Sequence, residues 1–428
     1  MFGFANFLLL ALFAAAVFDL FFALARGGGL RGALHGLWNT PHLLFGQQLA
    51  EWRLQLGRIL FAAGLAAYEI SVVFCNSMAR QNWAWVQGVM SPVLEWLAFL
   101  CFGAKILFGT RYTWRELLAG GALYFIARWV YFNSQNIWWI GIVVAVLAAK
   151  EVSLRRPLQV YFASGCAAMA VVLALHFAGI VAPDLTSERM GALRGTYGYG
   201  HPNTFGGLVF GLVLAYALLR AQKVRWVDCL LVFAVGVFLL VGPASRSAAL
   251  CTLALAVGLV FCRLRAGRVP RWWPGTCAGM VGLTAAVSYL LPLLVIKVGP
   301  WNNDIGPAWL AKLDSLLTCR ISLTWMAYRL LDVKIAGQVF NWPTVDNSFA
   351  FALFQFGPVV AALLGILFAA ALWGHAKQGR RVEVCCLFAM LAYAYMEVQP
   401  FHLTTNPTAL LLCGAVFAQT SARWQKIE

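Results

Sequence analysis

Long apolar segments alternate with short polar ones along the whole chain. A helix that spans a membrane needs about 20 mostly apolar residues. About thirteen segments meet or approach this length: 4–25, 57–77, 90–108, 115–133, 135–149, 157–182, 203–221, 226–243, 245–263, 273–296, 347–373, 382–399 and 403–421. The pattern predicts an all-α fold, a polytopic bundle of about 12–13 transmembrane helices that forms one membrane domain over residues 1–428. Residues 30–50, apolar but interrupted by polar side chains, are expected to form an interfacial helix or one more span.

Composition excludes a soluble protein. Of the 428 residues 62% are hydrophobic and only 11% are charged, whereas a soluble domain of this length keeps a charged shell. The net charge of +16 falls mainly in short basic clusters between apolar segments, which is typical of loops that face anionic lipid, so no nucleic-acid partner is expected. The 11 cysteines lie almost all within apolar segments without metal-ligand spacing, so we expect neither disulfides nor a metal site.

The basic clusters also predict the orientation of the chain. They occupy one alternating set of loops, and the C-terminal end belongs to the same set, which places all of them on the cytoplasmic side. The opposite face then carries an outer segment, 183–203, and a large outer loop, 297–346. Loops as long as the second are often functional. Within it, the stretch from Ala308 to Val333 has helical spacing and predicts one or two short helices on the outer surface.

Arginines from three separate segments lie on this predicted outer face. Arg194 precedes GTYGYGHPNTFGG, Arg246 lies in GPASRSAAL, and Arg320 lies in the large outer loop. Guanidinium groups bind phosphate bidentately and keep their charge when buried, so several together would hold a lipid pyrophosphate. Transfer of a sugar from such a donor also needs a base for the acceptor hydroxyl, commonly a carboxylate or a histidine.

Each of these residues also has a plain structural interpretation. A single outer arginine can simply extend from the membrane toward water, and the glycines near Gly206 can serve close helix packing. Asn203 can cap a helix, and His201 can be an interfacial histidine without a chemical role.

Four motifs together resemble the O-antigen ligase and polysaccharide polymerase superfamily of bacterial membranes, over about residues 130–415. In order they are Arg194 with GYGHPNTFG, the Ser-Arg-Ser around Arg246, LLTCRISLTWMAY around Arg320, and VDNSFAFALFQFG from Val345 to Gly357. Ligases of this superfamily generally have His-Asn where this chain has Asp346-Asn347, which favours a repeat-unit polymerase of a capsular or exopolysaccharide cluster. Thr318-Cys319 replaces the Ser-Gly that usually precedes the arginine.

The resemblance implies a GT-C-like bundle in the bacterial cytoplasmic membrane with an extracytoplasmic active site. It implies an inverting, metal-independent polymerase of undecaprenyl-pyrophosphate-linked oligosaccharides that needs no cofactor. Membrane lipids, a flippase and a chain-length regulator are the other expected partners. Arg194, Arg246 and Arg320 would hold the donor pyrophosphate. Asp346 would be the catalytic base with His201 as the alternative, while Asn203 and Asn347 would position sugars or the loop backbone.

Two other functions remain open at this point. An O-antigen ligase or another glycan transferase of the same superfamily would use the same chemistry on a different acceptor. A transporter or flippase of lipid-linked sugars belongs to another class, and it predicts titratable or basic residues along a central path instead of at one face.

Overall fold

A computed structural model describes residues 2–25, 29–46, 51–181, 187–189, 192–264, 270–295 and 306–417. Parts of the outer segment 183–203 and of the large outer loop 297–346, as well as the C-terminal residues 418–428, lie outside this description. The described residues are mostly helical with very little strand, which confirms the predicted all-α fold.

Within the described residues, the N-terminal half contains eight α-helices and two short strands that lie far apart in the sequence. The helices are α1 (Phe2–Ala25), α2 (Leu30–Asn39), α3 (Glu51–Cys75), α4 (Ala79–Asn82), α5 (Ser91–Phe108), α6 (Trp114–Ser134), α7 (Ile137–Ala148) and α8 (Arg155–Phe177). A 3-10 turn, η1 (Leu44–Gly46), and a π-helical turn, η2 (Val86–Met90), precede α3 and α5. Strands β1 (His42–Leu43) and β2 (Arg111–Tyr112) pair antiparallel.

The C-terminal half carries the longer outer segments. Its helices are α9 (Pro202–Leu219), α10 (Trp226–Val241), α11 (Arg246–Leu264), α12 (Trp273–Leu290), α13 (Ala308–Leu316), α14 (Arg320–Leu330), α15 (Ser348–Phe351), α16 (Pro358–Lys377), α17 (Arg381–Met396) and α18 (Cys413–Val416). Short turns are η3 (Leu291–Leu294), the π-helical η4 (Ala352–Phe356), η5 (Gln399–Phe401) and η6 (Pro407–Leu412). The hairpin β3 (Ser187–Arg189) and β4 (Ala192–Arg194) precedes α9.

Among the described residues, eight helical stretches are long and apolar enough to cross a membrane: 6–25, 51–75, 86–108, 155–177, 202–219, 246–264, 273–294 and 358–377. Their number supports a multi-pass membrane protein. Three more apolar helices, 137–148, 226–241 and 407–416, are shorter than a typical span. The sequence had left two possibilities for residues 30–50, an interfacial helix or one more span. The structure has a short amphipathic helix, α2, over residues 30–39.

One expected span is interrupted. The segment 347–373 was predicted as one continuous helix, but it divides into α15 with η4 and the separate helix α16. Gly357 at the division has φ 88°, and a Cβ there would lie 2.1 Å from the carbonyl oxygen of Ile335. The irregular backbone that follows α14 therefore packs directly against the break, which only a glycine with positive φ accommodates.

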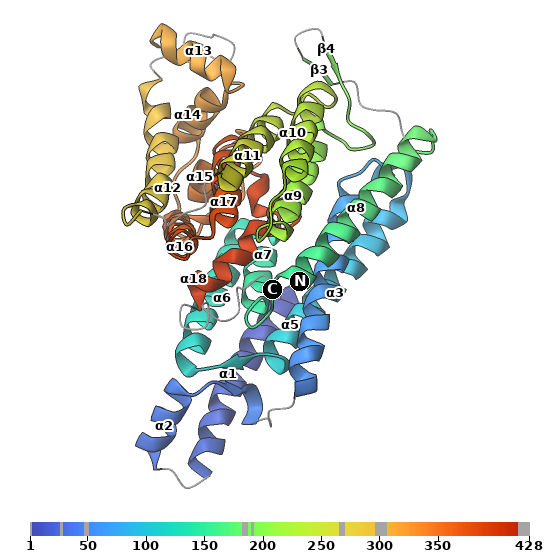
Figure 1. Cartoon of the computed structure of the whole chain (residues 1–428). Coiled ribbons are helices and arrows are strands. Elements are labelled where there is room, and N and C mark those ends of the chain that lie inside the picture. The colour runs from blue at the N-terminus through green and yellow to red at the C-terminus, as the bar shows by residue number, and fades with distance from the viewer. Residues whose placement is uncertain are drawn as a thin grey trace.

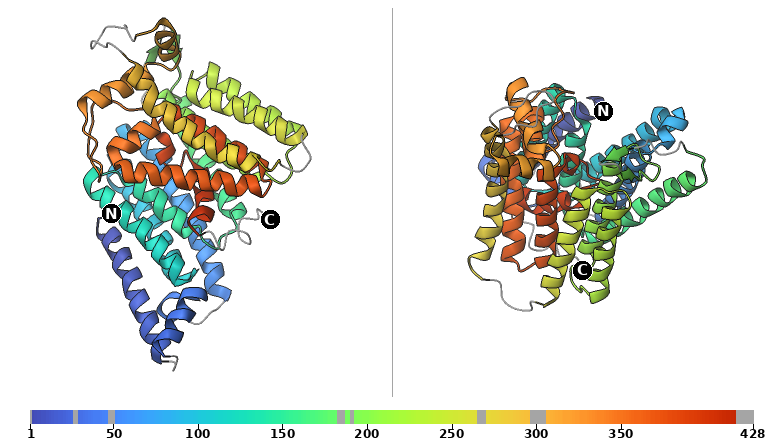
Figure 2. Two further views of the ribbon diagram at one scale, coloured as in Figure 1. Left: turned by 90° about the vertical axis from the view of Figure 1, so that its left-hand side faces the viewer. Right: turned by 90° about the horizontal axis from the view of Figure 1, so that it is seen from above.

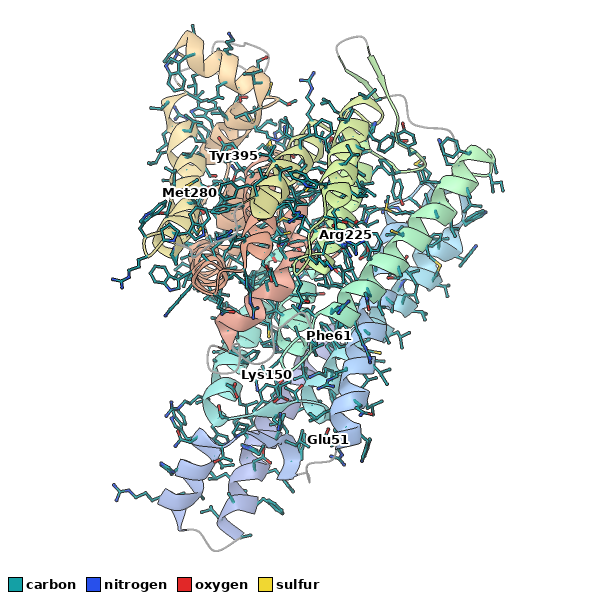
Figure 3. All side chains as sticks on the ribbon, in the orientation of Figure 1. Glu51, Phe61, Lys150, Arg225, Met280 and Tyr395 are labelled. Carbon is teal, nitrogen blue, oxygen red and sulfur yellow. The ribbon has the colours of Figure 1, made fainter. Side chains whose placement is uncertain are left out.

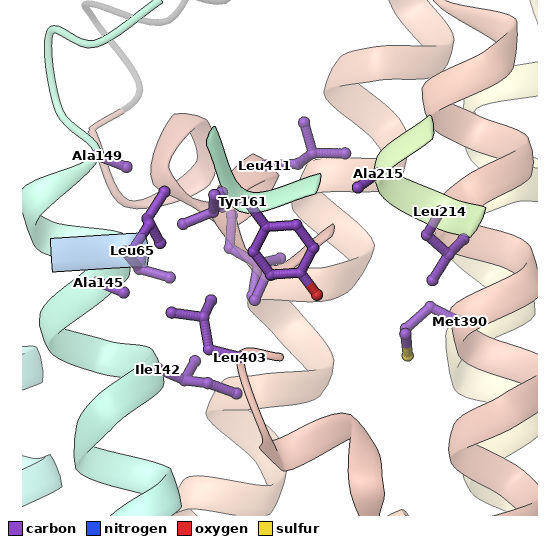
Figure 4. Close-up of a cluster of buried hydrophobic side chains, with 14 of the residues drawn as sticks. Leu65, Ile142, Ala145, Ala149, Tyr161, Leu214, Ala215, Met390, Leu403 and Leu411 are labelled. Carbon is purple, nitrogen blue, oxygen red and sulfur yellow. The ribbon is translucent and has the colours of Figure 1, made fainter. Parts of the chain in front are cut away.

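Figure 1 shows α1 and α2 at the lower end and α9 to α15 in the upper part, while α3 and α8 run side by side along the right-hand side. Helices α12 and α16 pack side by side, as the left-hand view of Figure 2 shows. Tyr161 of α8 lies in the buried cluster that joins the two halves, near Leu65, Leu214 and Leu403 (Figure 4). Its hydroxyl donates to the carbonyl oxygen of Thr404.

Basic residues collect at one end of the bundle. In the C-terminal half, Arg220, Arg263 and Lys377 end α9, α11 and α16, and Arg225 and Arg381 stand at the starts of α10 and α17. In the N-terminal half, Lys150 (labelled in Figure 3) forms an ion pair of 3.2 Å with Glu116 after α7. The starts of α9, α11 and α15 and the end of α17 lie at the opposite end, which the basic clusters predict to be extracytoplasmic.

Candidate functional site

Three hydrogen-bond donors meet on one carboxylate oxygen at the predicted outer end of the bundle. The oxygen is Oε1 of Glu397, the residue that follows α17. It accepts from Arg320 Nη2 at 2.6 Å, from Ser247 Oγ at 2.8 Å and from Asn203 Nδ2 at 3.1 Å. The donors come from α14, α11 and α9, so the site exists only where these helices meet the end of α17.

The site is closed to solvent. Glu397 is 5% exposed and Arg320 is 8% exposed, so their ion pair is buried. The rest of the guanidinium is also engaged, since Nε donates to the carbonyl oxygen of Met396 and Nη1 to that of Leu317 at 2.8 Å. Arginine suits this place because its planar group offers donors in several fixed directions.

The start of α14 sets the direction of Arg320. Cys319, the residue before the helix, has φ 62° and provides no side-chain cap. Instead the carboxylate of Asp314 from α13 accepts from the backbone N–H of Ile321 at 2.7 Å and of Ser322 at 3.2 Å. These bonds satisfy backbone donors that a helix start leaves open and place a negative charge at the positive end of the helix.

Asn203 connects a second arginine to the cluster. Its side-chain oxygen accepts from Arg194 Nη2 at 2.9 Å, while its amide donates to Glu397. Its backbone carbonyl accepts from Gln399 Nε2 at 3.1 Å, and Gln399 Oε1 in turn accepts from Tyr393 at 2.7 Å. Arg194 is 7% exposed, so two guanidinium groups are buried on either side of Asn203.

Close packing at two adjacent glycines makes this arrangement possible. A Cβ on Gly206 would lie 2.3 Å from Ser245 Oγ, and one on Gly207 would lie 1.8 Å from Gln399 Oε1. These two glycines, which end the segment GTYGYGHPNTFGG, therefore let the start of α9 approach both α11 and the turn after α17.

His201 and Arg246 lie at the rim. His201 is exposed and begins α9, where its Nδ1 accepts from the backbone N–H of Asn203 at 3.1 Å. Arg246 is the exposed first residue of α11, and its neighbours Ser245 and Ser247 are the ones whose side chains reach Asn203 and Glu397. The structure thus places Arg194, Asn203 and Arg320 in one cluster and leaves these two residues beside it.

Asp346 and Asn347 have different surroundings although they are adjacent. Asn347 is buried and caps α15, since its side-chain oxygen accepts from the backbone N–H of Phe349 at 2.9 Å and its amide donates to Ser288 at 3.1 Å. Asp346 is half-buried, and within the described part of the chain no hydrogen bond or ion pair engages its carboxylate. The next residue, Ser348, donates its hydroxyl to the Glu397 carbonyl oxygen, which brings this segment to the cluster.

Burial, together with the negative charge of Asp346, leaves the pKa of Glu397 raised to about 7. The Arg320 guanidinium and the Ser247 hydroxyl act in the opposite direction. Glu397 can therefore change its charge near neutral pH, and Asp346 lies close enough to influence it.

Sequence reasoning missed the centre of the site. No role was predicted from the sequence for Glu397, Ser247, Gln399 or Asp314. A carboxylate at the outer end of an apolar segment, on the face where arginines gather, was the available signal. Among the described residues, no group of three histidine, cysteine, aspartate or glutamate side chains is arranged to hold a metal ion.

An apolar cavity adjoins the cluster. It opens between α12, α15, α16 and α17, and its lining includes Tyr289, Ser348, Leu364 and Met390. Ser348 is shared, because it also bonds the Glu397 backbone. The site therefore combines the two buried guanidinium groups of Arg194 and Arg320 with neutral hydrogen-bond donors. The carboxylate of Asp346 and the apolar cavity lie next to them.

Comparisons with protein-family models, with curated proteins and with solved structures each gave no match for this chain.

Proposed function

We propose that this protein is a membrane glycosyltransferase that polymerises undecaprenyl-pyrophosphate-linked oligosaccharide repeat units on the outer face of a bacterial cytoplasmic membrane. The product would be a capsular, extracellular or O-antigen polysaccharide. The observation that carries the proposal is the convergence of Arg320, Ser247 and Asn203 on a single carboxylate oxygen. Donors that meet on one anionic oxygen provide the geometry that a phosphate oxygen needs.

The donor lipid would be held through its pyrophosphate. Arg320 faces the cluster from α14 and Arg194 supports it through Asn203, so two fixed positive charges lie at the place where the leaving group develops negative charge. Such preorganised charge is the largest contribution in many enzymes and suits a leaving pyrophosphate. The apolar cavity beside Ser348 offers part of the nearby space that a hydrocarbon chain requires.

The transfer itself would be a direct displacement. The acceptor hydroxyl attacks the anomeric carbon, the bond from that carbon to the pyrophosphate oxygen breaks, and its electron pair stays on the lipid pyrophosphate, so the configuration inverts. The hydroxyl proton passes to Asp346, whose carboxylate is not occupied by another described residue. His201 remains the alternative base. Asn203 would contact the donor, while Asn347 holds the start of α15 behind Asp346.

The placement in the membrane follows from the basic end of the bundle. With α6, α7, α10 and α17 as further spans, the bundle has about twelve spans in a GT-C-like arrangement. The cluster at the end of α17 is then extracytoplasmic, and the C-terminus is cytoplasmic when the apolar stretch 407–416 crosses the membrane as one more span.

The test is elongation by the purified protein in proteoliposomes supplied with lipid-linked repeat units, in EDTA. We expect the wild type to form higher oligomers on lipid and Arg320→Ala to form fewer by at least about a hundredfold. Arg329→Ala is the matched control, because Arg329 is an exposed arginine of the same helix.

Three results would change the proposal. Units that cross the bilayer without elongation identify a transporter. Transfer of the glycan to lipid A core and not to a second lipid-linked unit identifies a ligase. Equal elongation by Arg320→Ala and the wild type removes the cluster from the reaction.

A further inference from the structure

Glu397 engages the same donors that a bound diphosphate would need. Its Oε1 accepts hydrogen bonds from three donors, Arg320, Ser247 and Asn203. A phosphate oxygen that accepts from Arg320 and Ser247 in this geometry must take the position of Oε1 or lie next to it. Two negative oxygens side by side in a buried place repel each other strongly.

We propose that Glu397 is an internal competitor for the anion site, and that a diphosphate binds there only as Glu397 takes up a proton and releases its three donors. This inference rests on the anion-binding part of the proposed function and not on the transfer of a sugar. It makes the affinity of the site for its donor lipid depend on pH, with stronger binding on the acidic side of neutrality.

The groups around Glu397 decide whether a proton can be taken up. Arg320 of α14 favours the charged form, and Arg194 lies behind Asn203 on the side of α9. Asp346, ahead of α15, opposes the charged form, and Tyr393 of α17 is neutral. From α11, Ser247 donates to Glu397, while Arg246 and the nearby His201 are exposed at the rim.

The balance of these groups supports the exchange. Burial and Asp346 raise the pKa of Glu397 to about 7 despite Arg320. A diphosphate brought to the cluster adds negative charge and raises that pKa further, so binding and proton uptake favour each other. Arg320 keeps its bonds to Met396 and Leu317 throughout, which leaves Nη2 to exchange one anion for the other.

The experiment is isothermal titration of the full-length protein in nanodiscs with a short-chain prenyl diphosphate sugar. This diester probe keeps both diphosphate charges fixed around neutral pH. Titration in two buffers of different ionisation enthalpy counts the protons taken up with each ligand. We expect about one proton at about pH 8 and close to none at about pH 5.5, with affinity falling nearly tenfold per pH unit above about 7.

The variant Glu397→Gln imitates the protonated acid. It should bind the probe about tenfold more tightly than the wild type at about pH 8 and without proton uptake. Glu383→Gln is the matched control, since Glu383 is a buried glutamate at the other end of the same helix, and it should behave as the wild type does. Asp346→Asn should retain the proton uptake.

The outcomes separate this inference from the proposed function. Binding by the wild type without proton uptake, or uptake that Asp346→Asn abolishes, overturns the role of Glu397 and leaves the transferase standing. Proton-coupled binding by a protein that never elongates overturns the transferase and leaves Glu397 as stated. Failure of both the wild type and Glu397→Gln to bind the probe overturns both. The proton count of the wild type is decisive even where a variant is recovered in low yield.

Discussion

Arg320 Nη2 lies 2.6 Å from Glu397 Oε1, and both side chains are more than nine-tenths buried. This ion pair joins the large outer loop to the end of α17, across 77 residues of sequence. Removing one partner of such a pair leaves a buried charge without compensation, which is costly, whereas removing both is often tolerated. The pair therefore has consequences for stability that can be separated from its part in the proposed sugar transfer.

The first prediction concerns a double-mutant cycle on this pair. Arg320→Met should lower the free energy of unfolding by about 3 kcal/mol at about pH 8, because Glu397 is then buried without its cation. The double variant Arg320→Met with Glu397→Gln should recover most of the loss. Thermal unfolding in detergent measures both. A double variant that is no more stable than Arg320→Met would show that the two side chains are not coupled.

The second prediction concerns the pH dependence of stability. The pKa of Glu397 is raised from 4.5 to about 7, so between these values the folded protein holds a proton that the unfolded chain releases. The resulting contribution to stability is fully present below about pH 4.5 and is lost as the pH rises through about 7. The melting temperature of the wild type, relative to that of Glu397→Gln, should therefore fall from about pH 5 to about pH 8. A constant difference would contradict the raised pKa.

The third prediction concerns the packing of α9. Gly207→Ala places a methyl group where Gln399 Oε1 now lies, so Gln399 must move and release the backbone carbonyl of Asn203. We expect a loss of about 1–3 kcal/mol in stability and slower elongation. Gly282→Ala in α12 is the control, because nothing lies within 4 Å of its Cβ position, and it should be neutral or slightly stabilising. Equal behaviour of the two variants would argue against the close contact.

The fourth prediction concerns the start of α14. Asp314→Ala removes the acceptor for the backbone N–H groups of Ile321 and Ser322, which should cost about 1–2 kcal/mol and let Arg320 shift. Asp314→Asn keeps an acceptor oxygen and should lose less. Hydrogen exchange of α14 together with the elongation rate tests this. Faster exchange with unchanged elongation would mean that the cap does not position Arg320.

The fifth prediction concerns orientation. Cys319 is exposed and directly precedes Arg320, whereas the other described cysteines are buried or partly buried. A membrane-impermeant maleimide should label Cys319 from the outside in intact spheroplasts, and Cys319→Ser should abolish the label. Labelling that appears only after permeabilisation would place the cluster on the cytoplasmic side.

The helices could be predicted because each apolar segment is continuous in the sequence. The division at Gly357 was missed although a Gly-Pro pair marks it, since a run of apolar residues on both sides outweighed that local signal. The contact between Gly357 and the backbone of Ile335 requires a glycine at this position, and no pattern in the sequence predicts that contact. Such contacts arise between segments that the sequence keeps apart.

The same reasoning explains the partial prediction of the site. Arg194 and Arg320 were assigned to one face by the distribution of basic residues, and the structure brings them together through Asn203 and Glu397. Arg246 was assigned to the same face. At the start of α11, however, the side chains that point toward the cluster are those of Ser245 and Ser247. The rotation of α11 about its own axis decides which of its side chains face the cluster. That rotation depends on how α11 packs against α9 and α17.

Asn203 and Glu397 are 194 residues apart, and the hydrogen bond between their side chains has a consequence for the order of events during synthesis. Membrane proteins are synthesised and inserted from the N-terminus onward. The early helices therefore reach the membrane with Arg194 and Asn203 already in place but with no partner carboxylate. The cluster therefore cannot form gradually during synthesis and must form in one late step, when the ribosome has delivered the end of α17.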